Sequence, residues 1–350
     1  MKKFAINGRF VVRKQTGQER FARELINELD GISKRGEFTL VVPKYATDIP
    51  NLQNIEVIRY GNLKSHIWEQ IDFLYYIKKH NLISVNLTTK CPLFSPDIVC
   101  LHDACIFEMR KLLTHNLYGK MSYIWHYLIF KVAALKAKKI LTVSCYSKKR
   151  LMHYLKIPSD KIAIIYNSWQ HFNRVKTDNN VFSKLPANIK RKDYYLAVSS
   201  LAPQKNFVWI KEVAKKNPTK QFVICGGSGG FTNTKEQESE PENLYFTGYL
   251  TDGEVKALMS NCRAFIHPAI YEGFGIPPLE AMSCGAELIL SKATCLPEIY
   301  ENSAHYINPY DYNVDLEALL AQKIEPSTCV LNKFSWHQEA AKLYEILKSL

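Results

Sequence analysis

The sequence predicts an α/β protein built from two doubly wound parallel sheets. Short apolar runs alternate with amphipathic helical patterns, as is typical of parallel sheets covered by helices. The alternation stops in a polar stretch at 170–192 and then begins again. The length of 350 residues suits about two domains. We therefore expect an N-terminal domain at 1–169, a linker at 170–192 and a C-terminal domain at 193–334.

In the first half, apolar runs and helical periodicity predict seven strands and three helices. The helix at 17–30 is the clearest, because Phe21, Leu25, Ile26 and Leu29 share one face. The expected strands lie at 3–8, 38–43, 55–60, 82–88, 97–103, 139–145 and 161–167. The other expected helices lie at 113–138 and 147–155.

The second half repeats this pattern and ends in an amphipathic helix at 335–350, with Ser335 as its N-cap. The expected strands lie at 194–200, 220–227, 243–249, 263–268, 286–291 and 303–309. The expected helices lie at 206–217, 251–262, 277–285 and near 313–324, with a turn at 295–300. Two such Rossmann-like halves predict a site in a cleft at the carboxyl ends of the strands.

Composition favours a cytosolic protein. Nine cysteines occur without a Cys-x-x-Cys pair, which favours reduced thiols over disulfides or a zinc site. The first residues form too short an apolar run for a signal peptide. The longest apolar stretch, from Tyr123, is well short of the ~20 residues that span a bilayer.

Charge is distributed unevenly along the chain. Residues 1–175 hold 28 Lys and Arg against 13 Asp and Glu, whereas residues 176–350 hold 18 against 20. The net charge of +13 therefore comes from the first half. Such an excess of positive charge in one half suggests an anionic partner: a membrane surface, a nucleic acid or a phosphorylated substrate.

The stretch "YEGFGIPPLE", residues 271–280, carries the most specific chemistry. It follows an expected strand, and a proline at 277 or 278 suits the first position of a helix. Glycines on either side of Phe274 let the backbone approach a ligand closely. The amides of Gly273, Phe274, Gly275 and Ile276 would then face an anion at the helix start.

Two carboxylates flank this turn. Glu272 precedes it, and Glu280 is expected in the first helical turn. Carboxylates only accept hydrogen bonds, so the pair suits sugar hydroxyls on either side of a diphosphate. For Glu280, a purely structural role beside the positive helix end is an equally good interpretation.

The stretch resembles the signature of the retaining GT-B glycosyltransferases of family four, the group 1 glycosyltransferases of bacterial surface-polysaccharide type. Further segments agree in order, among them "TGQERFARELI", "LHD", "LAPQKN" and "FTGYLTDGEVKALMSNC". The resemblance covers nearly the whole chain. It implies a GT-B fold, two Rossmann-like domains facing across a cleft, with the terminal helix packing back on the N-terminal domain.

The resemblance implies that the C-terminal domain binds a nucleotide diphosphate sugar. Glu272 would contact the transferred sugar, and Glu280 the ribose. Lys205 would pair with the diphosphate, and Gly248 and Tyr249 would border the base. The family often has an arginine near Ser199 and Ser200, so its usual pair of cations is in doubt here.

In the N-terminal domain the resemblance places Gly17 against the diphosphate and His102 near the sugar. Asp103, Ser144 and Asn167 would lie near the acceptor or the cleft. For Gly17, an ordinary helix-start glycine is an equally good interpretation. Ser144 and Asn167 could simply cap turns.

The resemblance implies transfer of a hexose to a growing glycan with retention of configuration. The leaving diphosphate would accept the proton of the acceptor hydroxyl, so catalysis is mostly positioning and charge stabilisation. No Asp-x-Asp motif occurs, and we expect neither a metal nor another cofactor. The acceptor would be a glycan, lipid-diphosphate-linked in capsule, exopolysaccharide or lipopolysaccharide synthesis.

The segment from Arg110 mixes basic and aromatic residues, which favours peripheral contact with the anionic inner face of the cell membrane over an ordinary helix with solvated lysines. A GT-B protein that binds nucleotide sugar or glycan without transfer remains an alternative. A dehydrogenase lacks Gly-x-Gly-x-x-Gly after the first strand, and a nucleic-acid binder lacks a recognition motif.

Overall fold

The computed structural model describes residues 3–114, 116–198, 202–226 and 240–350. The chain divides into two compact units. The first unit comprises residues 1–167 and 335–350, and the second comprises residues 168–334. The terminal segment thus returns to the first unit after the second has been completed.

The first unit is built on a seven-stranded parallel sheet in the order β3-β2-β1-β4-β5-β6-β7. Its strands are β1 (Phe4–Asn7), β2 (Phe38–Val42), β3 (Glu56–Arg59), β4 (Ile83–Asn86), β5 (Ile98–Cys100), β6 (Lys139–Thr142) and β7 (Ile162–Ile164). The order reverses between β1 and β4, which is the switch point where such sheets bind ligands. All seven expected strands are confirmed.

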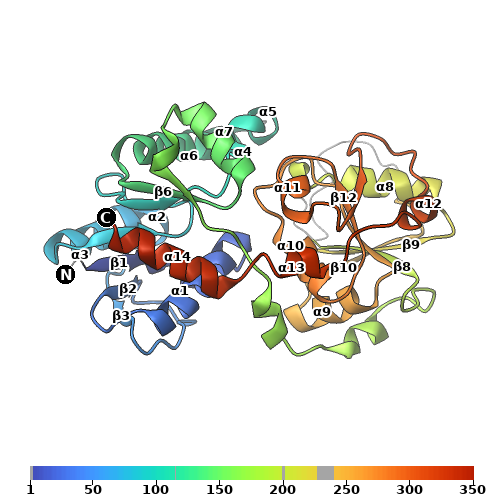
Figure 1. Ribbon diagram of the computed structural model, residues 1–350, viewed down its shortest axis with the longest axis horizontal. Helices are drawn as coiled ribbons and strands as arrows, with labels where there is room; N and C mark the ends of the chain where they lie inside the picture. Colours follow the sequence, from blue (N-terminus) through green and yellow to red (C-terminus); the bar gives the residue numbers. More distant parts are fainter. Residues whose placement is uncertain (1–2, 115, 199–201, 227–239) are drawn as a thin grey trace. The chain divides into compact units, whose positions relative to one another are not determined.

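Helices cover this sheet. They are α1 (Gly17–Ile32), α2 (Ser65–Trp68), α3 (Leu74–Lys79), α4 (Cys105–Glu108), α5 (Arg110–Leu113), α6 (Leu117–Lys136), α7 (Cys145–Leu155) and α14 (Trp336–Lys348). Figure 1 shows α14 beside α1, where Trp336 packs edge-on against Phe21. Ser335 caps α14 as expected, accepting a hydrogen bond from the Gln338 amide. Among the described residues, no helix is long and apolar enough to cross a membrane.

Helical structure at 65–79 was not expected. Between α2 and α3 the chain forms one π-helical segment, η2 (Glu69–Phe73). A π turn disrupts the 3.6-residue period that identifies a helix in sequence. Trp68, Phe73 and Ile77 are buried and form a small core with β1 and β2.

The second unit is a six-stranded parallel sheet in the order β10-β9-β8-β11-β12-β13. Its strands are β8 (Tyr194–Val198), β9 (Gln221–Cys225), β10 (Leu244–Gly248), β11 (Ala264–His267), β12 (Leu288–Ser291) and β13 (His305–Ile307). All six were expected, and the switch point lies between β8 and β11. The two units therefore share one strand topology, and both are doubly wound as predicted.

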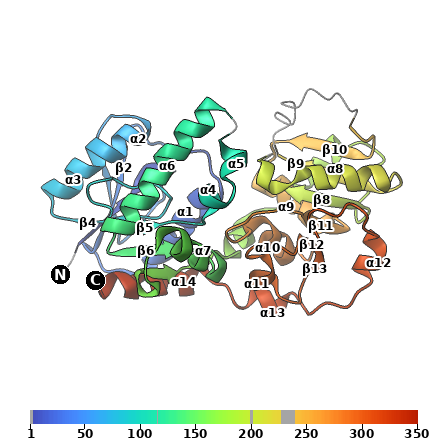
Figure 2. The same ribbon diagram turned by 90° about the horizontal axis from the view of Figure 1, so that it is seen from above.

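Helices lie on both faces of the second sheet, as Figures 1 and 2 show. They are α8 (Phe207–Lys216), α9 (Asp252–Asn261), α10 (Ile276–Ser283), α11 (Leu296–Tyr300), α12 (Leu316–Leu320) and α13 (Thr328–Leu331). Trp209, Ile210 and Leu316 bring α8 and α12 into a hydrophobic core of this unit. The expected turn at 295–300 is wrong, because α11 forms there with Pro297 in its first turn.

Residues 170–192, expected to be a linker, lie within the second unit. They carry two 3-10 helices, η4 (Gln170–Arg174) and η5 (Asn179–Lys184). Phe172 and Val181 are buried, and Lys184 pairs with Glu254 of α9. This stretch is polar because it is a surface segment that contacts α9. Ser199 and Ser200 lie outside the described residues.

Candidate functional site

Two chain segments meet at the carboxyl edge of the second sheet. Strand β8 leads toward the 3-10 helix η6 (Pro203–Lys205), and β11 leads into the "YEGFGIPPLE" turn. Because β8 and β11 are neighbours and parallel, both segments emerge at the switch point of this sheet. A hydrogen bond from the Ile270 amide to the Gln204 carbonyl, 2.9 Å long, ties them together.

Glu272 is the centre of this arrangement. Its Oε1 forms an ion pair with Lys205 Nζ and lies 2.7 Å from Nε2 of His267, at the end of β11. The backbone amide of Glu272 donates to Thr294 Oγ1 at 3.1 Å. The structure thus joins the predicted sugar-binding carboxylate to the predicted diphosphate-binding lysine. His267 and Thr294 were not predicted, because only tertiary contacts reveal their proximity.

The electrostatics of Glu272 follow from its partners. Burial alone would raise its pKa, but Lys205 and His267 outweigh burial and lower the pKa to about 2. The side chain is therefore ionised throughout the neutral range. An ionised carboxylate can only accept hydrogen bonds, so a ligand that contacts it must present donors, as a sugar hydroxyl does.

The glycine turn leads directly into α10. Gly275 adopts φ +89°, a left-handed conformation that disfavours a side chain, and its carbonyl accepts a hydrogen bond from Tyr300 Oη. Helix α10 starts at Ile276, one residue before the expected prolines. The ring of Phe274 is buried and packs edge-on against Phe334, with centroids 5.3 Å apart.

The position of Glu280 corrects one expectation. It is the fifth residue of α10 and lies beyond the first turn, so the structural interpretation based on the helix end is wrong. Its Oε1 lies 2.7 Å from Nε2 of His171, and both side chains are buried. His171 was not predicted, since it lies 109 positions away in a segment without a motif.

Gly248 and Tyr249 follow at the carboxyl end of β10. Gly248 has φ +71°, and its carbonyl accepts a hydrogen bond from the Gly226 amide at 3.0 Å. The side chain of Tyr249 is mostly exposed. Both predicted base-contacting residues thus lie at the same edge of the sheet as Lys205 and Glu272.

In the first unit, His102 directly follows β5 and is buried against Phe21, with ring centroids 4.9 Å apart. Its Nε2 lies 3.0 Å from the Leu87 carbonyl, which can only accept, so the proton is on Nε2. Burial lowers its pKa to about 4. His102 is therefore neutral at pH 7, and its Nδ1 is available as an acceptor.

The remaining predicted residues of the first unit occupy the starts of helices and the end of a strand. Gly17 is the first residue of α1, behind the N-cap Thr16. Asp103 Oδ1 accepts a hydrogen bond from the Cys105 amide at 2.8 Å. Ser144 caps α7, in agreement with the structural interpretation. Asn167 is buried, and its Oδ1 has no hydrogen-bond partner in the described part of the chain.

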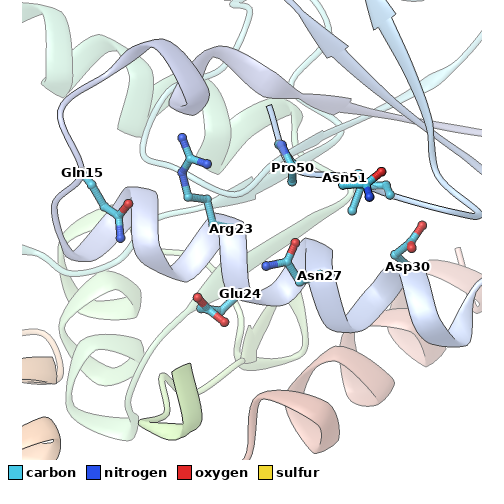
Figure 3. A pocket seen from close by; sticks show the side chains of 8 residues that line it. Gln15, Arg23, Glu24, Asn27, Asp30, Pro50 and Asn51 are labelled. Carbon is cyan, nitrogen blue, oxygen red and sulfur yellow. The ribbon is translucent and has the colours of Figure 1, made fainter. Parts of the chain in front are cut away.

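A polar hollow of about 460 Å³ lies along α1, lined by none of the predicted site residues (Figure 3). Its charged groups hold the chain around residue 50 in place. Both carboxylate oxygens of Asp30 accept backbone amides, from Gln53 at 2.8 Å and from Ile55 at 2.7 Å. Arg23 pairs with Asp48 at 2.6 Å. This hollow is therefore explained as a structural anchor.

Comparison with known proteins identifies the second unit. Residues 180–323 match the family described as Glycosyl transferases group 1. O-antigen chain mannosyltransferase RfbU of Salmonella typhimurium (strain LT2) is 27% identical over 226 residues, which is 63% of this chain and 59% of that protein. Serotype-specific mannosyltransferase WbdA of Escherichia coli is 29% identical over 198 residues, 50% of this chain and 23% of that protein.

Solved structures match over the whole chain. Sucrose-phosphate synthase from Thermosynechococcus elongatus superposes with a TM-score of 0.71 at 15% identity, covering 100% of this chain and 99% of that one. Anabaena HepE in complex with UDP-glucose gives a TM-score of 0.68 at 16% identity, covering 100% of both chains. The protein therefore has the GT-B fold, and its residues 180–323 match the group 1 glycosyl transferase family.

Proposed function

We propose that the protein is a retaining, metal-independent glycosyltransferase that moves a hexose from a nucleotide diphosphate sugar to a glycan acceptor. The observation that carries this proposal is the Lys205–Glu272 ion pair at the switch point of the family domain. A lysine ammonium suits a diphosphate, and a neighbouring carboxylate suits sugar hydroxyls. A nucleotide diphosphate sugar carries both of these groups, a diphosphate and sugar hydroxyls.

Glu272, Lys205 and Glu280 bind different parts of the donor. Glu272 is ionised and accepts hydrogen bonds from hydroxyls of the transferred sugar. The Lys205 ammonium has three N–H donors, so it can keep Glu272 and also bind a phosphate oxygen. Its positive charge then stabilises the negative charge that grows on the leaving diphosphate. Glu280, held by His171, binds the ribose hydroxyls.

The proton of the acceptor hydroxyl passes to the leaving diphosphate on the same face of the sugar. No side chain needs to act as a covalent nucleophile, and no other cofactor takes part. His102 stays neutral and holds the sugar through a hydrogen bond. Asp103 lies beside it at the end of β5 and orients the acceptor. The reaction then depends on positioning and leaving-group stabilisation.

Mannose is the first candidate for the transferred sugar, because both relatives described above carry the name mannosyltransferase. The acceptor is a surface glycan, such as a lipid-diphosphate-linked chain in capsule, exopolysaccharide or lipopolysaccharide synthesis. The relatives' names support an O-antigen type of glycan in particular.

Helix α6 supports a location at the inner face of the cell membrane. One face packs into the core through Ile129, Phe130 and Ala133. The opposite face exposes an apolar stripe at helical spacing, flanked by Lys120 and Lys131. The stripe consists of Leu117, Met121, Ile124, Leu128 and Leu135. Apolar side chains beside lysines suit an anionic bilayer surface.

A transfer assay tests the proposal. The full chain is incubated with nucleotide diphosphate sugars, mannose donors included, and with lipid-diphosphate glycans. We expect a product whose new linkage keeps the anomeric configuration of the donor, formed equally well in a chelator. Glu272→Ala should abolish transfer while the circular dichroism spectrum stays native. Tight donor binding with neither transfer nor slow donor hydrolysis would instead favour a binding protein without catalysis.

A further inference from the structure

The first sheet has its own switch point, between β1 and β4, and a basic cluster lies there, with two buried members and one that is partly exposed. We define this cluster as Arg9, Arg13 and Lys90. Arg9 and Arg13 follow β1, and Lys90 lies four residues after the end of β4. The two strand ends are joined by a hydrogen bond of 3.0 Å from Asn7 Nδ2 to Asn86 Oδ1. Ligands of doubly wound sheets bind at this point.

Lys90 is a buried lysine with a neutral partner. It is 7% exposed, and its Nζ lies 2.6 Å from Nε2 of His126. Nδ1 of His126 lies 2.7 Å from the Ser122 carbonyl, which can only accept, so Nδ1 carries the ring proton. Nε2 therefore accepts a hydrogen bond from the lysine. Burial, followed by the nearby Lys90, lowers the pKa of His126 and keeps its ring neutral.

Two carboxylates beside the cluster, those of Glu69 and Glu19, already form ion pairs with its arginines. Arg9 Nη1 lies 2.7 Å from Glu69, and Arg13 Nη1 lies 2.7 Å from Glu19. In the described part of the chain, no carboxylate oxygen lies within 4.0 Å of Lys90 Nζ. Burial and the neighbouring Arg13 lower the pKa of Lys90 to about 8, so at pH 7 most molecules still carry the charge.

The segment around Lys90 is held from both sides. Gln70, in the π-helical segment η2, donates to the Cys91 carbonyl and accepts from the Leu93 amide, both at 2.9 Å. The Thr89 amide donates to Gln18 Oε1 at 3.3 Å, beside the start of α1. π-Helical turns occur frequently at functional sites. These contacts fix a buried cation in place. A buried cation without an anionic partner lowers the stability of the fold.

An unsatisfied donor lies near the cluster, linked to it through His66. The indole Nε1 of Trp125 is buried and has no hydrogen-bond partner in the described residues. Its ring lies 5.4 Å from that of His66, which accepts a hydrogen bond from Arg9 at 3.1 Å. An anionic group would neutralise the charge of Lys90. Its oxygens would also accept a hydrogen bond from the indole N–H of Trp125.

We propose that Lys90, together with Arg9 and Arg13, binds an oxyanion of the acceptor. The group is either a phosphate of a lipid diphosphate carrier or the carboxylate of an acidic sugar. Bound between these residues, it supplies the missing negative charge at the switch point of the first sheet. The proposal rests on the proposed function for the identity of the ligand, but the site itself stands on the geometry of the first unit.

Ligand binding can be tested without donor, acceptor or turnover. The full chain is prepared with isotope-labelled histidine, and the ring signals of His126 are assigned by their loss in His126→Asn. Inorganic pyrophosphate and glucuronate are titrated separately at pH 7. We expect one of them to shift the His126 signals, pyrophosphate for a carrier phosphate and glucuronate for an acidic sugar.

Two variants complete the experiment. Lys90→Met should bind the effective anion at least about tenfold more weakly, since charge-assisted hydrogen bonds are lost. Its melting temperature without ligand should change little, because the removal of a buried charge that lacks an anionic partner offsets the lost hydrogen bond to His126. Lys79→Met, at an exposed lysine ending α3, is the control and should bind like wild type.

If neither anion moves the His126 signals, or if Lys90→Met binds as well as wild type, Lys90 is only a structural link to α6 and the inference is wrong. A failure of the proposed function would look different. The anion would still bind in the first unit, whereas no sugar would be transferred from any donor.

Discussion

At the scale of single residues, Glu272 shows how its surroundings determine a side chain's protonation state. The carboxylate is buried, yet Lys205 and His267 keep it ionised. Glu280 lies eight positions later and has a different partner, His171. The two glutamates of one motif thus occupy separate environments, which suits contacts with two different parts of a donor.

The lowered pKa of Glu272 predicts a specific loss of stability in acid. A group whose pKa falls from 4.5 to about 2 on folding stabilises the fold above pH 4.5, and this stabilisation disappears as the pH falls toward 2. Between pH 6 and pH 3.5 the loss is roughly 1 kcal/mol. Glu272→Gln lacks this titration, so its stability should fall less over that range.

Hydrogen exchange of the β11 amides measures this difference, because variant and wild type are compared at the same pH and the units need not unfold together. The protection of wild type relative to the variant should shrink as the pH is lowered. A ratio that stays constant from pH 6 to pH 3.5 would mean that Glu272 is not held by Lys205 and His267.

At the scale of elements, the start of α10 depends on a glycine. Gly275 has φ +89°, and a Cβ added there would lie 3.0 Å from Leu296 Cδ2. Gly285, just after the same helix, has φ +79° but open space around its missing side chain. The two positions thus share backbone strain and differ in crowding.

Alanine at the two positions should separate these effects. Gly285→Ala is expected to cost about 1–2 kcal/mol of stability through its left-handed backbone alone. Gly275→Ala should cost more, because Leu296 must also move. Urea unfolding of the two variants checks this order, and equal costs would show that Leu296 yields freely.

At the scale of the whole molecule, the excess positive charge of residues 1–175 and the apolar stripe of α6 belong to the same unit. Together they predict binding to anionic vesicles at low salt, since surface electrostatic attraction is screened by ions. A glutamate within the stripe should oppose both apolar burial and charge attraction.

Vesicle sedimentation tests this expectation. Ile124→Glu should bind phosphatidylserine vesicles several-fold more weakly than wild type. Val208→Glu, at an exposed position of α8 in the second unit, is the control and should bind nearly as wild type does. No binding by wild type at low salt, or equal binding by both variants, would refute the membrane proposal.

The thirteen strands of the described residues could be predicted because buried parallel strands form short apolar runs in the sequence, as in "FTLVV" of β2. The helical stretch at 65–79 could not be predicted, since a π turn interrupts its 3.6-residue hydrophobic period. Within the site, Glu272 and Lys205 were recognisable from motifs. The contribution of His171 was not recognisable in the sequence, because His171 and Glu280 are 109 positions apart.

Lys90 shows the same limit more sharply. Nothing in "NLTTKC" distinguishes it from the other lysines of a basic half-chain. Its burial, its neutral histidine partner and the commitment of Glu69 and Glu19 to arginines become visible only when β1, β4 and α6 are brought together. Functional side chains supplied by tertiary packing leave no local pattern in the sequence.

The central claim is that Lys205 and Glu272 hold a nucleotide diphosphate sugar. Isothermal titration of a panel of these sugars into wild type and Lys205→Ala tests it most directly. We predict that at least one binds wild type, and that the variant binds it at least about tenfold more weakly because the diphosphate loses its cation. If no donor binds wild type, or if the variant binds equally well, the assignment of this site is contradicted.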